Sequence, residues 1–310
     1  MKKRCKLLCS LLAVLLICTA CRQAKPDAGA LKRSFQDSTG HTVEVNATLQ
    51  CVAVLFSSLA DIWVSAGGTV SVTVGETVER GIVATDGVTL VDSGAGKTID
   101  TETLIAAQPD LVIVSADIPA QTEAAALLRE AHIPVAELRV ESFTDYLKAL
   151  EICVYLCGDP IAYQAHGVDQ KTRIDAVLSQ KPFHGQKILF IRAGSTARSV
   201  KAKGSADHFA ASMLTELGAI NIADGAPLLL DGLSMEVILV EDPDYIFFTA
   251  MGDEEASKSY ITQMLTGETW QSLSAVQNGK WSYLPKELFH YKPCDRWAEA
   301  YDYLAALAHQ

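Results

Sequence analysis

The sequence predicts an α/β protein of two lobes, each a mainly parallel sheet flanked by helices, joined by a long connecting helix. Three observations support this fold class. First, one pattern occurs twice, as D-T-E-T-L-I-A-A-Q-P-D-L-V-I-V-S-A from Asp100 and as S-M-E-V-I-L-V-E-D-P-D-Y-I-F-F-T-A from Ser234. Second, each copy ends in a continuous apolar run, which is typical of a strand buried on both faces of a parallel sheet. Third, a stretch of almost forty residues between the two copies has a helical pattern.

Each copy of the repeat predicts a short helix followed by a buried strand. Asp100 and Ser234 are residue types that favour the N-cap, and an acid in the first turn suits the positive end of the helix dipole. A proline cannot continue a helix, so the chain leaves each helix before the strand. We interpret the copies as equivalent elements of two lobes. The alternative is that a common helix–strand connection arose twice by chance.

The same patterns give the domain boundaries. Pro160 suits the first turn of a helix, and residues 161–178 read as one helix of about 27 Å at 1.5 Å per residue. Such a connector predicts little hinge closure, because a helix is stiffer than a glycine- and serine-rich linker. The predicted segments are an N-terminal signal (1–21), a tether (22–34), an N-terminal α/β lobe (35–143), a helical connector (144–181) and a C-terminal α/β lobe (182–310).

The N-terminus has the features of an export signal. A basic start precedes an apolar run from Leu7 to Ile17, which is too short for a good membrane-spanning helix. The segment Cys18-Thr19-Ala20-Cys21 resembles the bacterial lipobox, in which cleavage exposes a cysteine that is then lipidated. Lipid on Cys21 predicts a body anchored to the extracytoplasmic face of the cell membrane. A plain signal peptide and an uncleaved anchor are the alternatives.

Charge and metal-binding residue types exclude several functions. The chain has 310 residues and a net charge of −11, which argues against a groove for nucleic acid. Its seven histidines are scattered, and no paired-cysteine pattern indicates a metal site. We assign no metal site, no catalytic residues and no resident cofactor. The cysteines that follow the tether are Cys51, Cys153, Cys157 and Cys294, and their role is left open.

An ordered set of motifs resembles a known family. The set comprises the lipobox, D-S-T-G-H-T-V from Asp37, the strand that ends F-S-S at Ser58, both copies of the repeat, L-G-A-I-N-I-A-D from Leu217, W-Q-S-L-S-A-V-Q-N-G-K from Trp270, and a terminal helix. These residues are similar to class III substrate-binding proteins of ABC importers, which capture ferric siderophores, haem and cobalamin. The resemblance implies a monomeric, non-enzymatic carrier that takes a small metal chelate between its lobes and delivers it to a permease dimer with its ATPase.

Ligand contacts are expected on loops at the strand ends, because ligands of open parallel sheets bind at the carboxyl edge. Arginine forks in an acidic chain suit carboxylates of haem or of a siderophore. His290, Tyr291 or Met251 would be the axial ligand if the cargo is haem, although an aromatic loop is more often plain packing. The predicted ligand-binding residues are Ser57, Ser58, Asp117, Arg192, Ser195, Arg198, Met251, His290 and Tyr291.

The resemblance also implies a docking role for Glu102 and Glu236. In the family, a glutamate at this place in each lobe binds arginines of the two permease subunits. The alternative is that both are simply favourable first-turn acids. Two other functions stay open, a chelatase-like enzyme of two lobes and a lipoprotein sensor without transport. The sequence does not identify the metal complex.

Overall fold

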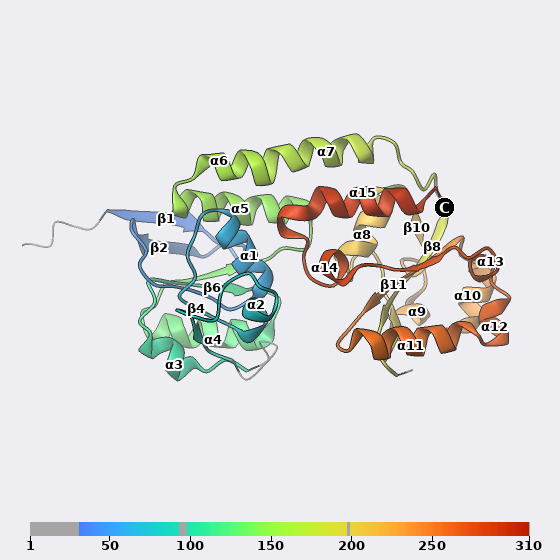
Figure 1. Cartoon of the computed structure of the whole chain (residues 1–310), viewed down its shortest axis with the longest axis horizontal. Helices are drawn as coiled ribbons and strands as arrows, with labels where there is room; N and C mark the ends of the chain where they lie inside the picture. Colours follow the sequence, from blue (N-terminus) through green and yellow to red (C-terminus); the bar gives the residue numbers. More distant parts are fainter. Residues whose placement is uncertain (1–30, 93–97, 197–198, 310) are drawn as a thin grey trace, which may run out of the picture.

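Two lobes lie side by side beneath a layer of long helices (Figure 1). The computed structural model describes residues 31–92, 98–196 and 199–309. The predicted signal peptide and lipidated Cys21 lie outside these residues. Each lobe has its own parallel sheet with helices on both faces, so the predicted fold class is confirmed.

The sheet of the N-terminal lobe has five parallel strands in the order β5-β4-β3-β6-β7. Its central strands are short and fully buried because helices cover both faces. The strands are β3 (Val52–Val54), β4 (Val72–Thr73), β5 (Thr89–Leu90), β6 (Leu111–Ser115) and β7 (Val135–Leu138). The helices of this lobe are α1 (Ser57–Ser65), α2 (Gly75–Glu79), α3 (Thr101–Ala106) and α4 (Pro119–Glu130).

The C-terminal lobe has a parallel sheet in the order β10-β8-β11-β12, with β9 antiparallel to β8. The strands are β8 (Lys187–Ala193), β9 (Lys201–Ala202), β10 (Ile220–Asn221), β11 (Tyr245–Ala250) and β12 (Trp281–Tyr283). The helices are α8 (Phe209–Glu216), α9 (Pro227–Asp231), α10 (Met235–Glu241), α11 (Glu254–Leu265), α12 (Glu268–Gln271), α13 (Ser274–Gln277), α14 (Lys286–Phe289), the 3-10 turn η3 (Cys294–Arg296) and α15 (Trp297–Leu307).

The sequence repeat is a structural repeat. In each lobe the repeat helix (α3 or α10) leads into a strand (β6 or β11) that pairs in parallel with the first strand of the sheet (β3 or β8). The aspartate of each Pro-Asp pair accepts hydrogen bonds from the backbone at the start of that first strand: Asp110 from Cys51 N, just before β3, at 2.9 Å, and Asp244 from Lys187 N, the first residue of β8, at 2.8 Å. Chance recurrence does not explain equal contacts in equal places.

Asp100 and Ser234 both occupy the N-cap position of their helices, as predicted. The Asp100 side chain accepts a hydrogen bond from Thr103 N, whereas the Ser234 side chain makes no capping bond to α10. The two helices nevertheless end alike. Gln108 (φ 49°) and Asp242 (φ 40°) turn the chain with left-handed backbone just before each proline.

The connector lies along the top of the molecule as seen in Figure 1. It consists of α5 (Phe143–Cys157) followed by a second helical run, which is α6 (Pro160–Tyr163), η1 (Gln164–Val168) and α7 (Asp169–Leu178). The second run is the predicted long helix, but η1 is a π-helical turn within it. At Gly167 in that turn, a Cβ would lie 3.1 Å from the Leu147 side chain, so α5 packs closely here.

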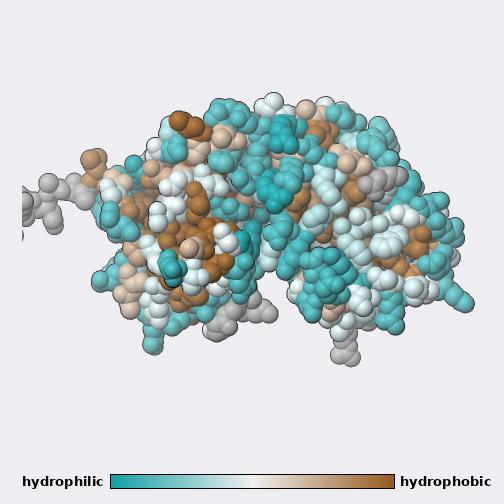
Figure 2. Space-filling view, viewed as in Figure 1, coloured by the Kyte–Doolittle hydropathy of each residue, from teal (hydrophilic) through white to brown (hydrophobic). Residues whose placement is uncertain are grey.

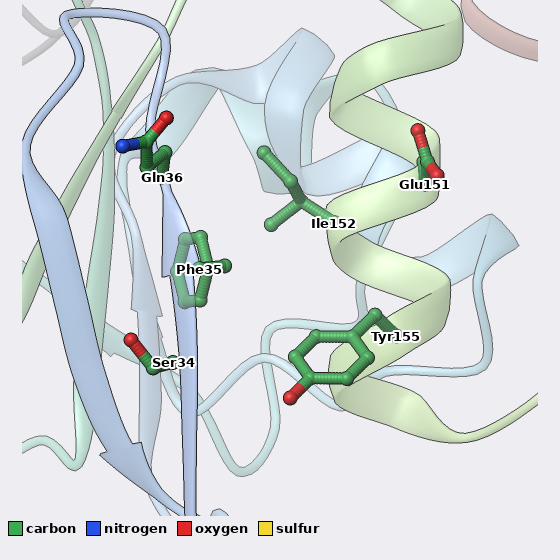
Figure 3. Close-up of a pocket in the computed structure, with 6 residues that line it drawn as sticks. All are labelled: Ser34, Phe35, Gln36, Glu151, Ile152 and Tyr155. Atoms are coloured by element: carbon green, nitrogen blue, oxygen red, sulfur yellow. The ribbon is translucent and has the colours of Figure 1, made fainter.

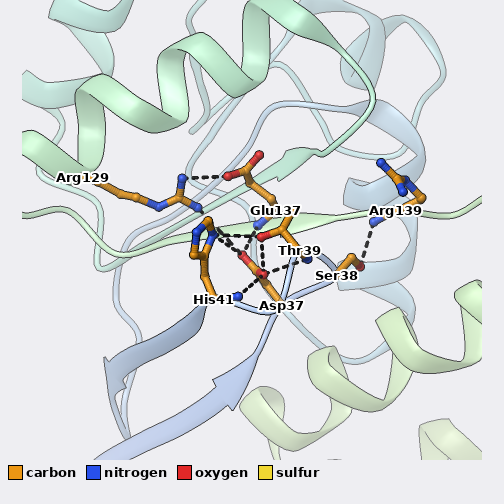
Figure 4. A network of polar contacts seen from close by, with 7 residues as sticks. All are labelled: Asp37, Ser38, Thr39, His41, Arg129, Glu137 and Arg139. Carbon is orange, nitrogen blue, oxygen red and sulfur yellow. Dashed lines mark hydrogen bonds and ion pairs between the residues drawn. The ribbon is translucent and has the colours of Figure 1, made fainter.

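A β-hairpin precedes the first strand of the N-terminal sheet. Strands β1 (Lys32–Gln36) and β2 (Thr42–Asn46) are antiparallel. Because β1 begins at Lys32, this strand starts inside the segment that was expected to be tether. The hairpin turn is fixed to β7 by the buried carboxylate of Asp37, which accepts hydrogen bonds from Thr39, His41 and Glu137 N (Figure 4).

Candidate ligand site between the lobes

In the N-terminal lobe, residues that follow the carboxyl ends of β6 and β7 face the gap between the lobes, and in the C-terminal lobe the segment that leads from β9 into α8 faces it. Figure 2 shows this gap as a deep notch between two mainly hydrophilic walls. A cavity of about 450 Å³ spans it, and its walls come from both lobes. The lining residues are Asp117, Glu141, Ser142, Ser205, Ala206, Asp207, His208, Phe209 and Ser212.

Four predicted residues come together in the C-terminal lobe, although none of them is among the residues that line this cavity. Arg192 is the second-last residue of strand β8 and does not lie in a loop. Its guanidinium donates a hydrogen bond to Met251 Sδ. The rings of His290 and Tyr291 meet edge to face, with centroids 5.1 Å apart. Burial, then Lys286 and Arg192, lower the pKa of His290. A neutral imidazole beside a guanidinium can therefore accept or ligate while the arginine binds an anion.

Ser57 and Ser58 have a different place from the one expected. Both lie in the first turn of α1, and the two residues are only 0% and 1% exposed. Ser57 Oγ donates to the carboxylate of Glu76, and both hydroxyls accept hydrogen bonds from Arg80, at 3.0 and 3.3 Å. In this conformation the two serines therefore hold Arg80 in place, and their contact with a ligand stays a prediction.

Two of the three acids that line the cavity, Glu141 and Asp117, are in ion pairs. The Glu141 carboxylate, which follows β7, is 2.7 Å from Lys292 Nζ of the C-terminal lobe. Asp117 is 2.7 Å from Arg139 on the same lobe. The predicted residue Asp117 does reach the gap, and its charge is shared with that arginine.

His208 is the most deeply buried ionisable group of the cavity. Its ring lies 4.9 Å from the Phe190 ring and 4.9 Å from the Phe209 ring, centroid to centroid. Nδ1 accepts a hydrogen bond from Ala210 N and so caps α8. Burial, followed by the charge of Lys292, lowers the pKa of His208 to about 3. The imidazole is thus neutral at physiological pH.

The structure does not place two of the predicted ligand-binding residues at the site, and several residues that it places near the site were not predicted. Ser195 lies exposed in the loop after β8, and Arg198 falls outside the described residues. Glu76 and Arg80 were not predicted, because their segment is rich in glycine and threonine and carries no strong periodic pattern. His208 and Lys292 were missed too, since nothing in their local sequence marks them as buried.

Glu102 and Glu236, the predicted docking residues, are exposed in the first turns of α3 and α10. The two helices lie in different lobes, on either side of the gap (Figure 1). Aligned residues share their environment: Leu104 and Ile238 are each 0% exposed, whereas Ile105 and Leu239 are 39% and 43% exposed. The two copies therefore present matching faces.

A separate groove of about 320 Å³ lies on the outer side of the N-terminal lobe. Figure 3 shows the side chains of Phe35 on β1 and of Ile152 and Tyr155 on α5 facing one another across it. Within residues 31–92, 98–196 and 199–309, no three acidic, histidine or cysteine residues form a metal-binding cluster. No helix in the same ranges is long and apolar enough to cross a bilayer.

Comparison with known proteins identifies the family. A sequence model described as periplasmic binding protein matches residues 52–288, which include both sheets. The chain belongs to this family. The family expected from the sequence is therefore confirmed, and its members are binding proteins with two lobes. Among proteins with curated descriptions, none matches this chain.

Solved structures support the fold. The chain is similar to a periplasmic solute binding protein from Veillonella parvula, at 19% identity and a TM-score of 0.68, over 89% of this chain and 86% of the other. It is similar to the vitamin B12 binding protein BtuF of Vibrio cholerae, at 18% identity and 0.67, over 84% and 97%. It is also similar to the catecholate-siderophore binding protein VctP from Vibrio cholerae, at 14% identity and 0.69, over 90% and 99%.

Proposed function

We propose that this periplasmic binding protein is the extracytoplasmic receptor of an ABC importer. It captures an iron complex, either a ferric siderophore or haem, or a corrinoid, in the gap between the lobes and passes it to a permease dimer with its ATPase. Lipid on Cys21 anchors it to the membrane. The observation that carries the proposal is the guanidinium of Arg192 beside His290, close to His208 in a cavity that both lobes line, in a chain of net charge −11.

The chemistry of the cluster around Arg192 favours a ligand with acidic groups. An arginine binds carboxylates or catecholate oxygens through paired hydrogen bonds. Around it stand the aromatic ring of Tyr291 and the thioether of Met251, which suit a flat or apolar ligand body.

A panel of three probes tests this function. The purified chain is titrated with haemin, ferric enterobactin and cyanocobalamin, and binding is followed by absorption and by retention after dialysis. We expect one probe to bind, and an absorption band near roughly 400 nm would identify haem with an axial ligand. If all three probes dialyse away completely, the proposed ligand classes are wrong.

An Arg192→Met variant locates the binding. Losing one charge-assisted contact should weaken affinity for the bound probe by about tenfold or more. The matched control is Arg173→Met, because Arg173 pairs with Asp302 on the helical layer, away from the gap. Equal affinity of the Arg192 variant and the control would place the ligand elsewhere.

For docking, Glu102 and Glu236 are the proposed contacts with a cationic patch on each permease subunit. Two acidic faces on matching lobes suit a partner with two-fold symmetry. Beside each acid, the exposed apolar residues Ile105 and Leu239 would add burial to the contact. The exposed position of the pair and the structural repeat support this role.

A double variant, Glu102→Ala with Glu236→Ala, tests the docking role. It should keep its affinity for the bound probe and lose probe uptake in cells that carry the permease and ATPase. Glu255→Ala is the control, because Glu255 is an exposed first-turn acid on α11, outside the repeat. Lost probe binding, or uptake at the level of the control, would contradict the role.

A further inference from the structure

The Arg80 side chain lies at the junction of the lobes and contacts both. On the N-terminal side its guanidinium donates hydrogen bonds to Ser57 and Ser58 and pairs with Asp61, with 3.7 Å between Nη2 and Oδ2. On the C-terminal side its Cζ lies 4.3 Å from the centroid of the Tyr291 ring. One residue therefore joins the first turns of α1 to the loop that carries two predicted ligand contacts.

Arg80 is deeply placed for an arginine. Its side chain is only 10% exposed, and its Nε is buried without a hydrogen-bond partner. Burying a guanidinium is unfavourable unless its surroundings fix it well. The contacts with Ser57, Ser58, Asp61 and the Tyr291 ring provide that fixation, so the position of Arg80 and the position of the ring depend on each other.

The chain around Tyr291 is bound to α1 at further points. We call residues 290–294 the junction segment. Lys292 N donates a hydrogen bond to Ser58 Oγ at 3.4 Å, and Cys294 Sγ donates one to Ser58 O at 3.3 Å. The segment belongs to the C-terminal lobe in sequence, yet it is held by the N-terminal lobe. Arg80 and Ser58 form the centre of this attachment.

We propose that Arg80 is a positioning residue for the ligand site. It fixes the junction segment against α1 and so holds His290 and Tyr291 in the orientation that meets the ligand, without contacting the ligand itself. The part that concerns affinity rests on the proposed function, whereas the fixation of the segment does not. Arg80 therefore couples the ligand loop of one lobe to the first helix of the other.

Exchange of amide hydrogens tests the fixation without any ligand. In an Arg80→Met variant, the Lys292 amide should exchange at least about tenfold faster than in the unmodified chain, because the ring contact and the serine bonds that support its acceptor are lost. Amides of β6 and β11 should keep their protection. Unchanged exchange at Lys292 would overturn the proposal, and Arg173→Met serves as the control.

A second variant keeps the test decisive if Arg80→Met fails to fold. Tyr291→Leu removes the ring and leaves every polar partner of Arg80 in place. The Lys292 amide of this variant should also lose protection from exchange, because the contact between the Arg80 guanidinium and the Tyr291 ring is gone. Full protection in this variant would contradict the coupling.

A double-variant cycle then distinguishes positioning from direct contact. With the probe of the panel that binds, whether haemin, ferric enterobactin or cyanocobalamin, Arg80→Met should weaken affinity about tenfold in the unmodified chain and cause little further loss in the Tyr291→Leu background. If the double variant loses affinity by the full product of the two single-variant losses, Arg80 contacts the ligand directly and the positioning role is refuted. If no probe binds but exchange rises as expected, the proposed function fails while the fixation of the segment stands.

Discussion

The buried imidazole of His208 makes the stability of the chain depend on pH in a way that can be calculated. Its pKa is lowered to about 3 by burial in the folded protein, whereas a histidine in an unfolded chain titrates near about 6.5. Protonation would also break the bond that Nδ1 accepts from Ala210 N. Below about pH 6.5 the unfolded chain binds a proton that the folded chain does not.

The sign and size follow from linkage. Because the folded pKa is depressed, the contribution of the neutral ring is fully present above about pH 6.5 and is lost progressively as the pH falls toward about 3. Between pH 7 and pH 5, uptake of that proton by the unfolded chain lowers the free energy of unfolding by about 2 kcal/mol.

Urea denaturation of the unmodified chain and of a His208→Asn variant measures this contribution. Asparagine is a good N-cap, so it can replace the bond to Ala210 N without titrating. The variant should lose ring packing equally at both pH values, and the difference between the two proteins should shrink by about 2 kcal/mol from pH 7 to pH 5.

His184→Asn is the control, because His184 is exposed. All other groups titrate in both proteins, so they cancel in the comparison. A difference between the unmodified chain and His208→Asn that is the same at pH 7 and pH 5 would refute the buried, neutral state of His208.

Three further predictions concern stability and reactivity. Asp37→Asn should lower the free energy of unfolding by about 3 kcal/mol in urea titration. The buried carboxylate accepts hydrogen bonds from several N–H groups, and the amide NH₂ of asparagine would face some of these donors instead. A loss below about 1 kcal/mol would contradict the network. Gly68→Ala should destabilise the chain by about 1–3 kcal/mol in the same assay, since its Cβ would lie 2.3 Å from the Trp63 ring, and an unchanged midpoint would argue against this packing. Iodoacetamide at pH 8 should label Cys153 and Cys157 far more slowly in the native than in the unfolded chain, because burial raises both thiol pKa values, that of Cys157 to about 11; equal rates would show that the helix is open.

The parts of the fold that the sequence predicts well are those with a strong local pattern. The buried runs of β6 and β11 are continuous and apolar, and the Pro-Asp pairs that precede them recur with the same hydrogen bonds. The export segment and Cys21 remain predictions from sequence. The connector was predicted as one helix, but its π-helical turn depends on contact with α5, which no local pattern reveals.

The site was predicted less well, because its contacts are tertiary. Arg192 and Met251 lie at the carboxyl ends of β8 and β11, whereas His290 and Tyr291 follow helix α14. Their contact with a ligand stays a prediction. Arg80, by contrast, gains its place from Ser57 and Ser58 of one helix and from a ring about two hundred residues further along the chain. Spacing in sequence carries no information about such a meeting.

The serines show the same limit from the other side. Ser57 and Ser58 follow a buried strand, so a loop at the carboxyl edge was expected, but helix α1 begins at Ser57 and buries both hydroxyls. The two serines do follow strand β3, as expected, but their hydroxyls form hydrogen bonds with Glu76 and Arg80 of the same chain.

A crystal structure of the chain with the probe that it binds most tightly would show where the ligand lies. We expect the metal chelate between the lobes, with an acidic group within hydrogen-bond distance of Arg192 and the ring of Tyr291 still against the guanidinium of Arg80. A chelate in the outer groove between Phe35 and Tyr155, with the gap between the lobes empty, would contradict this expectation.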